Sequence, residues 1–326
     1  MLQLFSVIVT EVAPTWDMAE LRGRPAGPSV YSNPGLAHGD AQWSLHVLTA
    51  AEDGWLCKAS LAALEQDGNA EYGARYSFSE LFSCTPAEDP VHWGFKSWDD
   101  FFTRQFRDID KVRPVGHRIV SACEARPYAL QANVKAYDSF WLKGNRYSVM
   151  EMLDHHELAE SFIGGTVFQS FLTLTSYHRW CAPVSGHVIE VRVVDGTYFS
   201  EATFAGFSSP IGPDPSGPDR SQVYVTEVAT RALIFIRAPP PIGIVCAMFV
   251  GLSDVSTCDI AHRFRDGLPK PVYKGEEIGT FRHGGSSYCL LFRKGLRLSW
   301  VPGAMPRENA RNVLVRSELA YGYTEE

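Results

Sequence analysis

The stretch TVFQSFLTLTSYHRWCAPVSGHVIEVRVV (166–194) decides the fold, because it holds two β-rich runs joined by a turn. Residues 166–175 and 187–194 are rich in β-branched and aromatic residues, which favour strands. Between them, a Pro and a Gly predict a tight turn. Further β-rich runs bounded by Gly, Pro or Ser lie at 232–236, 244–252 and 288–292. These runs predict a mostly antiparallel β domain over 111–326.

The first third of the chain has a helical rather than a β-rich sequence pattern. The periodicity of KASLAALEQ (58–66) predicts a short amphipathic helix. WDDFFTRQFR (98–107) follows Ser97, with acidic residues in its first turn and arginines in its last, which predicts a helix over the whole run. We therefore expect an α+β fold with a helical N-terminal segment over 43–110. Residues 1–42 are expected to form a flexible or atypical leader, and the Pro- and Gly-rich 205–220 a long surface loop.

Composition excludes several classes of protein. The chain has 326 residues, 45% of them hydrophobic, which is enough for a large buried core. A net charge of −7 without a run of Lys or Arg argues against nucleic acid or an anionic membrane as the main partner. Seven scattered cysteines lack metal-ligand spacing, which predicts reduced thiols and no metal site. The apolar runs at 2–13 and 242–252 are too short to span a bilayer, so we expect a cytoplasmic protein without a transmembrane segment.

Two segments carry candidate chemistry. In YHRWC (177–181), a His at the end of a strand, beside Arg and Trp, can act as an acid or a base. Taken alone, this segment favours a hydrogen-bonded structural His instead. In KGEEIGTFRHGGSSYCLLF (274–292), the GGSS at 284–287 precedes a hydrophobic strand. Taken alone, GGSS is a commonplace turn.

Taken together, these two segments resemble the phosphatidylserine decarboxylase family, whose processing motif is Gly-Ser-Thr or Gly-Ser-Ser. Similar blocks precede them in the same order, so the resemblance covers about residues 50–302. These blocks are GFKSWDDFFTRQFR (94–107), VSACEA (120–125) and KGNRYSVMEML (143–153). YHRW, GTYF (196–199) and VSTC (255–258) are most similar to the soluble fungal branch that includes L-tryptophan decarboxylase.

The resemblance implies a self-cleaving enzyme with a covalent pyruvoyl cofactor. The Ser286 hydroxyl would attack the carbonyl of Gly285, and the chain would divide between these two residues. Gly285 lacks a Cβ and lets the backbone bend for that attack. Ser286 would become the pyruvoyl group, which accepts the electrons released with CO₂. The resemblance assigns to His178 the return of a proton to the substrate and to Glu124 the orienting of a catalytic His.

Cys181 departs from the family pattern. Relatives carry a second His at this position, as the base for self-cleavage, paired with an acidic residue that is Glu124 here. An unperturbed thiol has a pKa of roughly 8.5, about two units above that of imidazole. A partly buried thiol would lie higher still unless a cation such as Arg179 offsets the burial. We therefore expect self-cleavage through Cys181 to be slow at neutral pH and faster at alkaline pH.

Three functions remain open at the level of sequence. The leading hypothesis is a pyruvoyl-dependent decarboxylase, a carboxy-lyase, of a free aromatic L-amino acid such as tryptophan. The second is a phosphatidylserine decarboxylase that makes phosphatidylethanolamine in phospholipid biosynthesis. The third is an unprocessed, non-catalytic homologue, which Cys181 supports. Sequence leaves the substrate open, because selectivity depends on the shape of the pocket.

Overall fold

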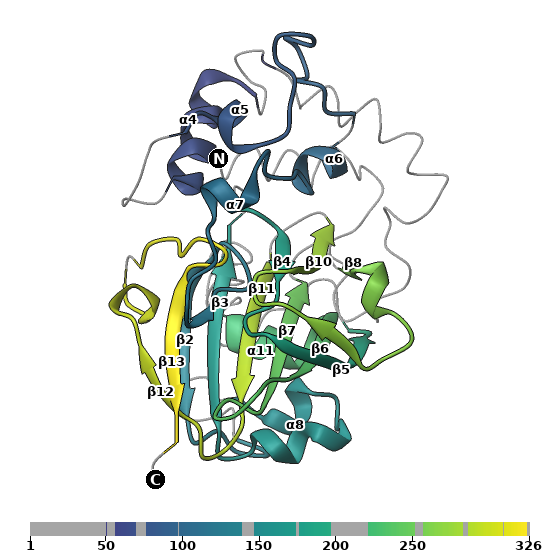
Figure 1. The fold of residues 1–326 in the computed structure, drawn as a ribbon, viewed down its shortest axis with the longest axis vertical. Coiled ribbons are helices and arrows are strands. Elements are labelled where there is room, and N and C mark those ends of the chain that lie inside the picture. Colours follow the sequence, from purple (N-terminus) through teal and green to yellow (C-terminus); the bar gives the residue numbers. More distant parts are fainter. Residues whose placement is uncertain are drawn as a thin grey trace, which may run out of the picture.

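Seven strands form one antiparallel sheet, in the order β2-β3-β11-β7-β6-β5-β9, in the computed structural model of the chain (Figure 1). Its strands are β2 (Arg126–Ala132), β3 (Thr166–Leu172), β5 (Gly186–Val194), β6 (Arg231–Arg237), β7 (Ile244–Gly251), β9 (Lys270–Val272) and β11 (Ser286–Phe292). The structure describes residues 50, 56–69, 76–96, 98–138, 147–173, 176–196, 221–251, 257–282, 286–308 and 310–324.

Two smaller antiparallel sheets, β1-β13-β12 and β4-β10-β8, complete the β structure of the described residues. Their strands are β1 (Ile119–Val120), β4 (Arg179–Cys181), β8 (Thr257–Ile260), β10 (Glu277–Arg282), β12 (Arg297–Trp300) and β13 (Glu318–Tyr323). Apolar residues of both small sheets share one cluster with one face of the large sheet. The small sheets therefore cover that face.

Short helices surround the sheets. They are α4 (Lys58–Gly68), α5 (Phe78–Leu81), α6 (Trp98–Phe102), α7 (Ile109–Val112), α8 (Val149–Met152), α11 (Gln222–Val228), and the 3₁₀ helices η2 (Glu157–Phe162), η3 (His262–Phe264) and η4 (Pro302–Ala304). Helices α4–α7 lie together at one end of the sheets (Figure 1). Apolar residues of α4–α7 belong to the same cluster as the small sheets, whereas α8, η2 and α11 pack on the opposite face of the large sheet. The described part of the chain is thus α+β, as predicted.

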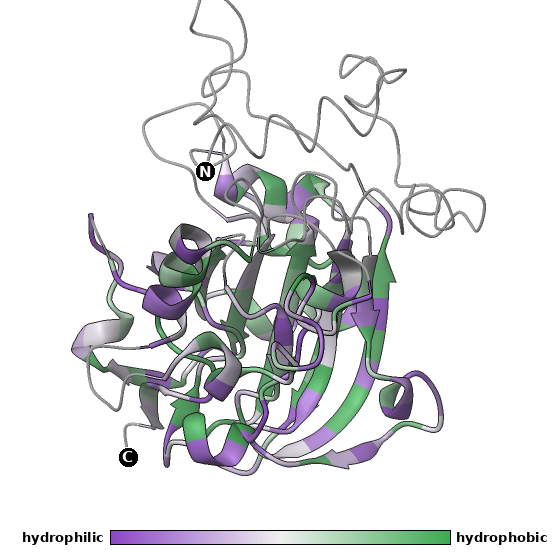
Figure 2. Ribbon diagram, turned by 90° about the horizontal axis from the view of Figure 1, so that it is seen from above, coloured by the Kyte–Doolittle hydropathy of each residue, from purple (hydrophilic) through white to green (hydrophobic). Residues whose placement is uncertain are grey.

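The central strand β11 shows why this sequence forms a doubly covered sheet. All seven of its residues are buried. Tyr288 and Leu290 face the small sheets, and Cys289 and Leu291 face α8, η2 and α11. A continuous apolar run is what a strand covered on both faces requires. Seen from the helical end, long hydrophobic stretches run along the strands (Figure 2).

The predicted strands are confirmed as β3, β5, β6, β7 and β11, although residues 174–175 lie outside the described residues. The end of the helix predicted over 98–107 was wrong, because α6 ends at Phe102. Beyond it, the Gln105 carbonyl accepts the amide of Ser83 (2.9 Å), and the Arg107 amide donates to the Leu81 carbonyl (2.8 Å). Pairing with a distant segment thus replaces the helical bonds that local propensity favours.

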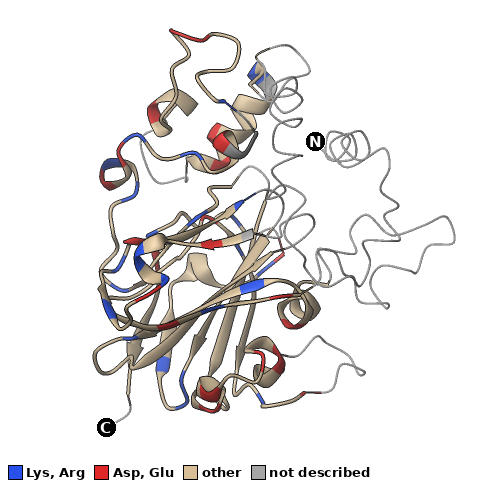
Figure 3. Cartoon of the chain, turned by 90° about the vertical axis from the view of Figure 1, so that its right-hand side faces the viewer, with Lys and Arg blue, Asp and Glu red and all other residues tan. Residues whose placement is uncertain are grey.

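Ser97, residues 1–42 and the predicted loop at 205–220 lie outside the described residues. The predicted division into segments at 42 and 110 stays a prediction. Acidic and basic residues are interspersed over the described part of the chain (Figure 3). A search of these residues finds no helix with the length and apolar character that crossing a membrane demands.

Glu227 on α11 is a carboxyl group with an unusual environment. It is half-buried, and its Oε1 accepts the amide of Ser148 (2.9 Å), just before α8. Burial is the main cause that raises the pKa of Glu227 to about 7, and Glu151 adds to it. In the unfolded chain this pKa is near 4.5. Between pH 4.5 and about pH 7, the Glu227 carboxyl is therefore mostly protonated in the folded state and mostly ionised in the unfolded state.

We expect Glu227→Gln to stabilise the protein increasingly as the pH rises. A carboxyl pKa that is raised on folding costs stability as pH climbs from about 4.5 to about 7, and Gln removes that cost. Thermal unfolding at pH 5 and pH 8 checks this, with the exposed Glu157→Gln as the matched control. If Glu227→Gln changed the Tm relative to the parent by the same amount at both pH values, the raised pKa of Glu227 would be contradicted.

Candidate active site

His178 lies just before β4, at one end of the small sheet β4-β10-β8. Its carbonyl oxygen accepts hydrogen bonds from the Phe281 amide (3.0 Å) and the Thr280 hydroxyl (3.3 Å) on β10. The imidazole is fully buried and stacks on Phe102 of α6, with ring centroids 3.9 Å apart. Neither ring nitrogen has a hydrogen-bond partner within the described ranges. Buried polar atoms are normally hydrogen-bonded, so this exception calls for an explanation.

Arg104 contributes to the charge environment of His178. Its buried guanidinium donates to the carbonyl oxygens of Phe101 (3.3 Å) and Ser176 (3.2 Å) and lies 4.5 Å from the centre of the Phe82 ring. Burial is the main cause that lowers the pKa of His178 well below its usual value, and the Arg104 cation adds to this effect, while the Ser176 backbone acts in the opposite direction. The imidazole is therefore neutral at pH 7 and can accept a proton.

Ser286 is the first residue of β11. It pairs with Leu172 of β3 on one side and with Gly251 of β7 on the other. Because side chains alternate along a strand, Ser286 shares its face with Tyr288, on the side of the small sheets. The residue is fully buried, and its Oγ has no hydrogen-bond partner in the described part of the chain. A hydroxyl without a partner thus begins the most constrained strand of the sheet.

His178 and Ser286 lie at the same end of the two sheets. Strand β10, which holds the His178 carbonyl through Phe281, is followed directly by β11. Ser286 is five residues beyond Phe281, so the chain between them spans at most about 18 Å. β10 ends and β11 begins beside the helices (Figure 1). Gly285, the other residue of the predicted cleavage site, lies outside the described residues.

Trp180 is a third buried side chain with an unpaired polar atom, and the sequence did not single it out. Its ring stacks flat on Phe249 of β7, with centroids 4.1 Å apart and planes 3° apart. Its Nε1 has no hydrogen-bond partner among the residues that the structure describes. His178, just before β4, and Trp180, on β4, both contact the Phe281 ring of β10, with centroids 6.5 Å and 4.8 Å apart. His178, Trp180 and Ser286 are thus three buried groups without hydrogen-bond partners in the described part of the chain, and we take them together as the candidate active site.

Cys181 differs from these three groups in the direction of its side chain and in the pKa of its thiol. Alternation along β4 turns its side chain to the face opposite Trp180. Burial is the main cause that raises the pKa of Cys181 to about 12, against a partial lowering by the Arg316 guanidinium. Arg179, the cation expected to offset burial, instead pairs with Glu277 (2.7 Å). The Cys181 thiol is therefore protonated at neutral pH.

Glu124 is buried and pairs with Arg113. The Arg113 Nε donates to its Oε1 over 2.5 Å, and the same guanidinium donates to the carbonyl oxygens of Val112 (2.8 Å) and Gly68 (2.6 Å). Burial raises the pKa of the Glu124 carboxyl, and Arg113 partly offsets this. The hydrogen-bond partner of Glu124 is thus Arg113, and the structure does not bring the Glu124 carboxylate into a hydrogen bond with His178.

A buried polar network supports the start of β11 from the other face of the sheet. Gln169 of β3 donates through Nε2 to the Ser287 hydroxyl (3.3 Å) and to the Gln222 carbonyl at the start of α11 (2.9 Å). Its Oε1 accepts the hydroxyl of Tyr147 (2.6 Å). The network holds the residue that follows Ser286. Sequence could not reveal it, because its members come from four distant segments.

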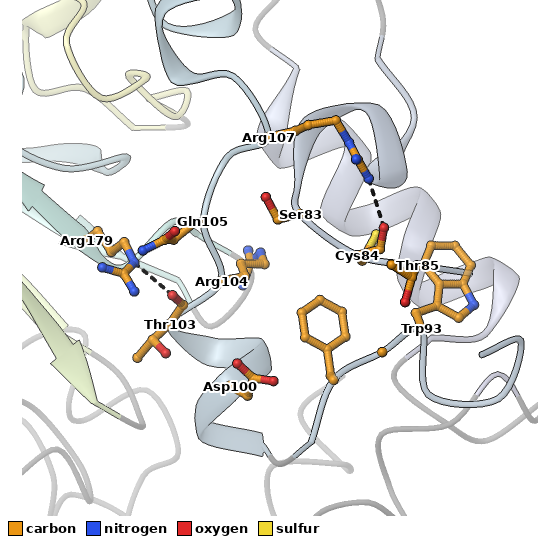
Figure 4. Close-up of a pocket in the computed structure, with 12 residues that line it drawn as sticks. Ser83, Cys84, Thr85, Trp93, Asp100, Thr103, Arg104, Gln105, Arg107 and Arg179 are labelled. Atoms are coloured by element: carbon orange, nitrogen blue, oxygen red, sulfur yellow. Dashed lines mark hydrogen bonds between the residues drawn. The ribbon is translucent and has the colours of Figure 1, made fainter. Parts of the chain in front are cut away.

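A pocket of about 500 Å³ opens beside the site, between α5, α6 and β4 (Figure 4). Its lining includes Arg104, Arg107, Arg179 and Asp100. Arg107 donates to the Cys84 carbonyl (2.8 Å), and Arg179 donates to the Thr103 carbonyl (2.8 Å). Arginines outnumber the single carboxylate of this lining, so the pocket has a basic character.

Comparison with known proteins finds relatives of one family. The sequence profile of the phosphatidylserine decarboxylase family matches residues 98–311. Decarboxylase iboD of Amanita muscaria is 38% identical over 261 residues, which cover 76% of this chain and 71% of the relative. An L-tryptophan decarboxylase of Psilocybe cubensis is 34% identical over 271 residues, which cover 78% of this chain and 59% of the relative. A phosphatidylserine decarboxylase proenzyme of Fusobacterium nucleatum is 29% identical over 64% of this chain and 62% of its own length. The chain thus spans about three fifths of the last two relatives.

We expect Arg113→Met to destabilise the protein by about 3–5 kcal/mol at pH 8, because it leaves the buried Glu124 carboxylate without its cation. The deficit should shrink as the pH falls from 8 to 5, because burial raises the pKa of the Glu124 carboxyl and Arg113→Met removes the cation that partly offsets this. Urea denaturation measures both values. The double variant Arg113→Met/Glu124→Leu is the control and should recover part of the loss; equal losses in the single and double variants would contradict a buried ion pair.

Proposed function

The chain belongs to the phosphatidylserine decarboxylase family, and from this premise we propose that it is a pyruvoyl-dependent decarboxylase acting on a free aromatic L-amino acid such as tryptophan. The observation that carries the proposal is the unpartnered hydroxyl of Ser286 at the start of β11. In this family the corresponding serine becomes the cofactor, and because the serine Cβ becomes the pyruvoyl methyl group, the buried position of Ser286 already has room for it.

Self-cleavage requires Ser286 to lose its hydroxyl proton as Oγ attacks the preceding carbonyl. The new bond joins Oγ to that carbonyl carbon, and the peptide C–N bond breaks. Elimination across Cα–Cβ of residue 286 and hydrolysis, which releases ammonia, leave the pyruvoyl group. A serine hydroxyl is a weak nucleophile, so a nearby base is needed.

We assign that base to His178, which shares its end of the sheets with Ser286. The neutral imidazole, with both nitrogens unpaired in the described ranges, can take up the proton. An imidazole with a lowered pKa also gives its proton back readily once it is charged, which suits the reprotonation of a substrate carbon. Cys181 is the weaker candidate, because its thiol keeps its proton and its side chain leaves the opposite face of β4.

The pyruvoyl carbonyl, once formed, supplies the sink for the electrons that CO₂ leaves behind. The residues around it contribute exclusion of water and positioning. Phe102, Phe249 and Phe281 surround His178 and Trp180 with apolar rings. An amino-acid substrate is favoured over a phospholipid because the relatives of higher identity are named decarboxylase iboD and L-tryptophan decarboxylase, whereas the phosphatidylserine decarboxylase proenzyme is less similar.

Intact mass and product analysis test the proposal. The purified chain should appear as two fragments, 1–285 and 286–326, and should release CO₂ and the matching amine from L-tryptophan, L-phenylalanine or L-tyrosine without added pyridoxal phosphate. Ser286→Ala should stay full-length and inactive, whereas the exposed control Ser299→Ala should behave as the parent. Cleavage of the Ser286→Ala chain at this bond would refute the assignment. Turnover of phosphatidylserine vesicles alone would establish the lipid substrate, and an intact, inactive parent would establish the non-catalytic homologue.

The pH dependence of self-cleavage separates His178 from Cys181 as the base. With His178, the rate should be nearly constant from pH 7 to 9, because the imidazole is already neutral over that range. With Cys181, the rate should rise about tenfold per pH unit, because the thiolate fraction does so well below a pKa of about 12. Time courses on freshly translated chain give both profiles. We expect the flat profile, full-rate cleavage of Cys181→Ala and an uncut His178→Ala; a tenfold rise per unit would return the role to Cys181.

A further inference from the structure

The Trp180 indole is held in one orientation by its neighbours. Its ring stacks on Phe249, and the Phe281 ring meets it edge-on, with centroids 4.8 Å apart and planes 73° apart. On β10, Gly279 lies opposite Trp180 in the ladder, and a Cβ on this glycine would lie 2.3 Å from the indole Cε3. The benzene edge of the indole therefore rests against β10, and no other residue than glycine leaves room for it.

The indole ring lies over β7, which is the neighbour of β11 in the large sheet. Nε1 is on the edge of the ring away from Cε3, so it points away from β10. In the small sheet β4-β10-β8, the two edge strands are β4 and β8. Strand β8 contacts β6 and β7 of the large sheet, which places β4 on the side of β11 and β3. Phe249, beneath the indole, pairs with Tyr288 of β11, two residues beyond Ser286. Phe249 is therefore one diagonal step from Ser286 on the same face of the large sheet, and the Trp180 ring lies on Phe249.

The unpaired Nε1 needs an acceptor. An indole N–H is a donor only, Trp180 is fully buried, and the described residues offer it no partner. Leaving such a donor unsatisfied is costly, so its presence beside Ser286 indicates an acceptor that arrives with a ligand. Of the groups common to all free amino acids, the amine is consumed by the cofactor carbonyl, and the α-carboxylate is the acceptor that remains.

We propose that the Trp180 Nε1–H donates a hydrogen bond to the α-carboxylate of the amino-acid substrate bound at Ser286. This inference rests on the proposed function. One neutral donor among the Phe249 and Phe281 rings orients the carboxylate without the strong stabilisation that a guanidinium would give it. A carboxylate that is oriented but poorly solvated loses CO₂ more easily, because the charge leaves it as the C–C bond breaks.

Trp180→Phe tests the proposal, because it removes the N–H donor and keeps an aromatic ring. The variant should still divide at Ser286, and its kcat/KM for L-tryptophan should fall about 10- to 100-fold, the loss expected for one hydrogen bond to a charged group. Trp300→Phe is the matched control, since Trp300 stacks on Phe168 (4.9 Å), and its kcat/KM should stay within about twofold of the parent. Trp180→Phe within twofold of an active parent would overturn the proposal while leaving the proposed function intact.

A binding measurement gives a second readout that does not depend on turnover. Processed enzyme is inactivated by borohydride reduction, and the indole N–H resonance of Trp180 is assigned by its loss in the Trp180→Phe variant. L-tryptophan should shift this resonance, whereas tryptamine, which lacks the carboxylate, should not. Equal shifts with both ligands, or none with either, would overturn the inference. A parent that is neither cut nor active would instead refute the proposed function on which the inference rests.

Discussion

The register of β11 is the constraint on which the rest of the site depends. From Ser286 to Phe292 this strand is paired on both sides, with β3 and with β7, and every residue is buried. A slip of one residue would turn Ser286 to the opposite face, away from His178 and Trp180, and would carry every apolar side chain of the strand with it. Because that slip would take the apolar side chains of β11 out of their packing in the core, the hydrophobic effect fixes the position of the Ser286 hydroxyl. The reactive residue is thus held by the core of the protein, rather than by a loop.

A cluster of aromatic rings connects the helical end of the protein to His178. Tyr177, next to His178, packs against Phe106 (4.2 Å between centroids) and Phe82 (6.3 Å), while Phe102 covers the imidazole. Arg104 lies among these rings. Phe102 at the end of α6 thus helps to exclude water from His178, and Arg104, just after α6, adds a positive charge near it; both effects lower the pKa of the imidazole and keep it neutral. The helical segment acts on the chemistry through burial and charge, without contributing a reacting group of its own.

The strands could be predicted from sequence because each is a run of apolar residues with its own boundaries, and Ser286 and His178 could be named because their motifs are contiguous. What sequence missed depends on distant partners. α6 ends early because Gln105 and Arg107 bond to the segment after α5. Glu124 was expected beside a catalytic His and pairs with Arg113. The unpaired Nε1 of Trp180 became visible only once β4, β7 and β10 were placed together, since a missing partner has no signature in a single segment.

The strand order has a consequence for how a chain cut at Ser286 stays together. The segment after the cut contains β11, β12 and β13, and β11 has both of its neighbours in the segment before the cut, while β13 has β1 there. If the chain is cut at Ser286 as proposed, the product would be a heterodimer whose smaller chain has no partner of its own for β11. Once unfolded, its two chains would have to find each other by mass action, whereas the uncut chain folds at the high effective concentration of a single molecule. Under the proposed cleavage, strand order would favour folding first and the cut second, and the unfolding of the cut protein at low concentration would be hard to reverse.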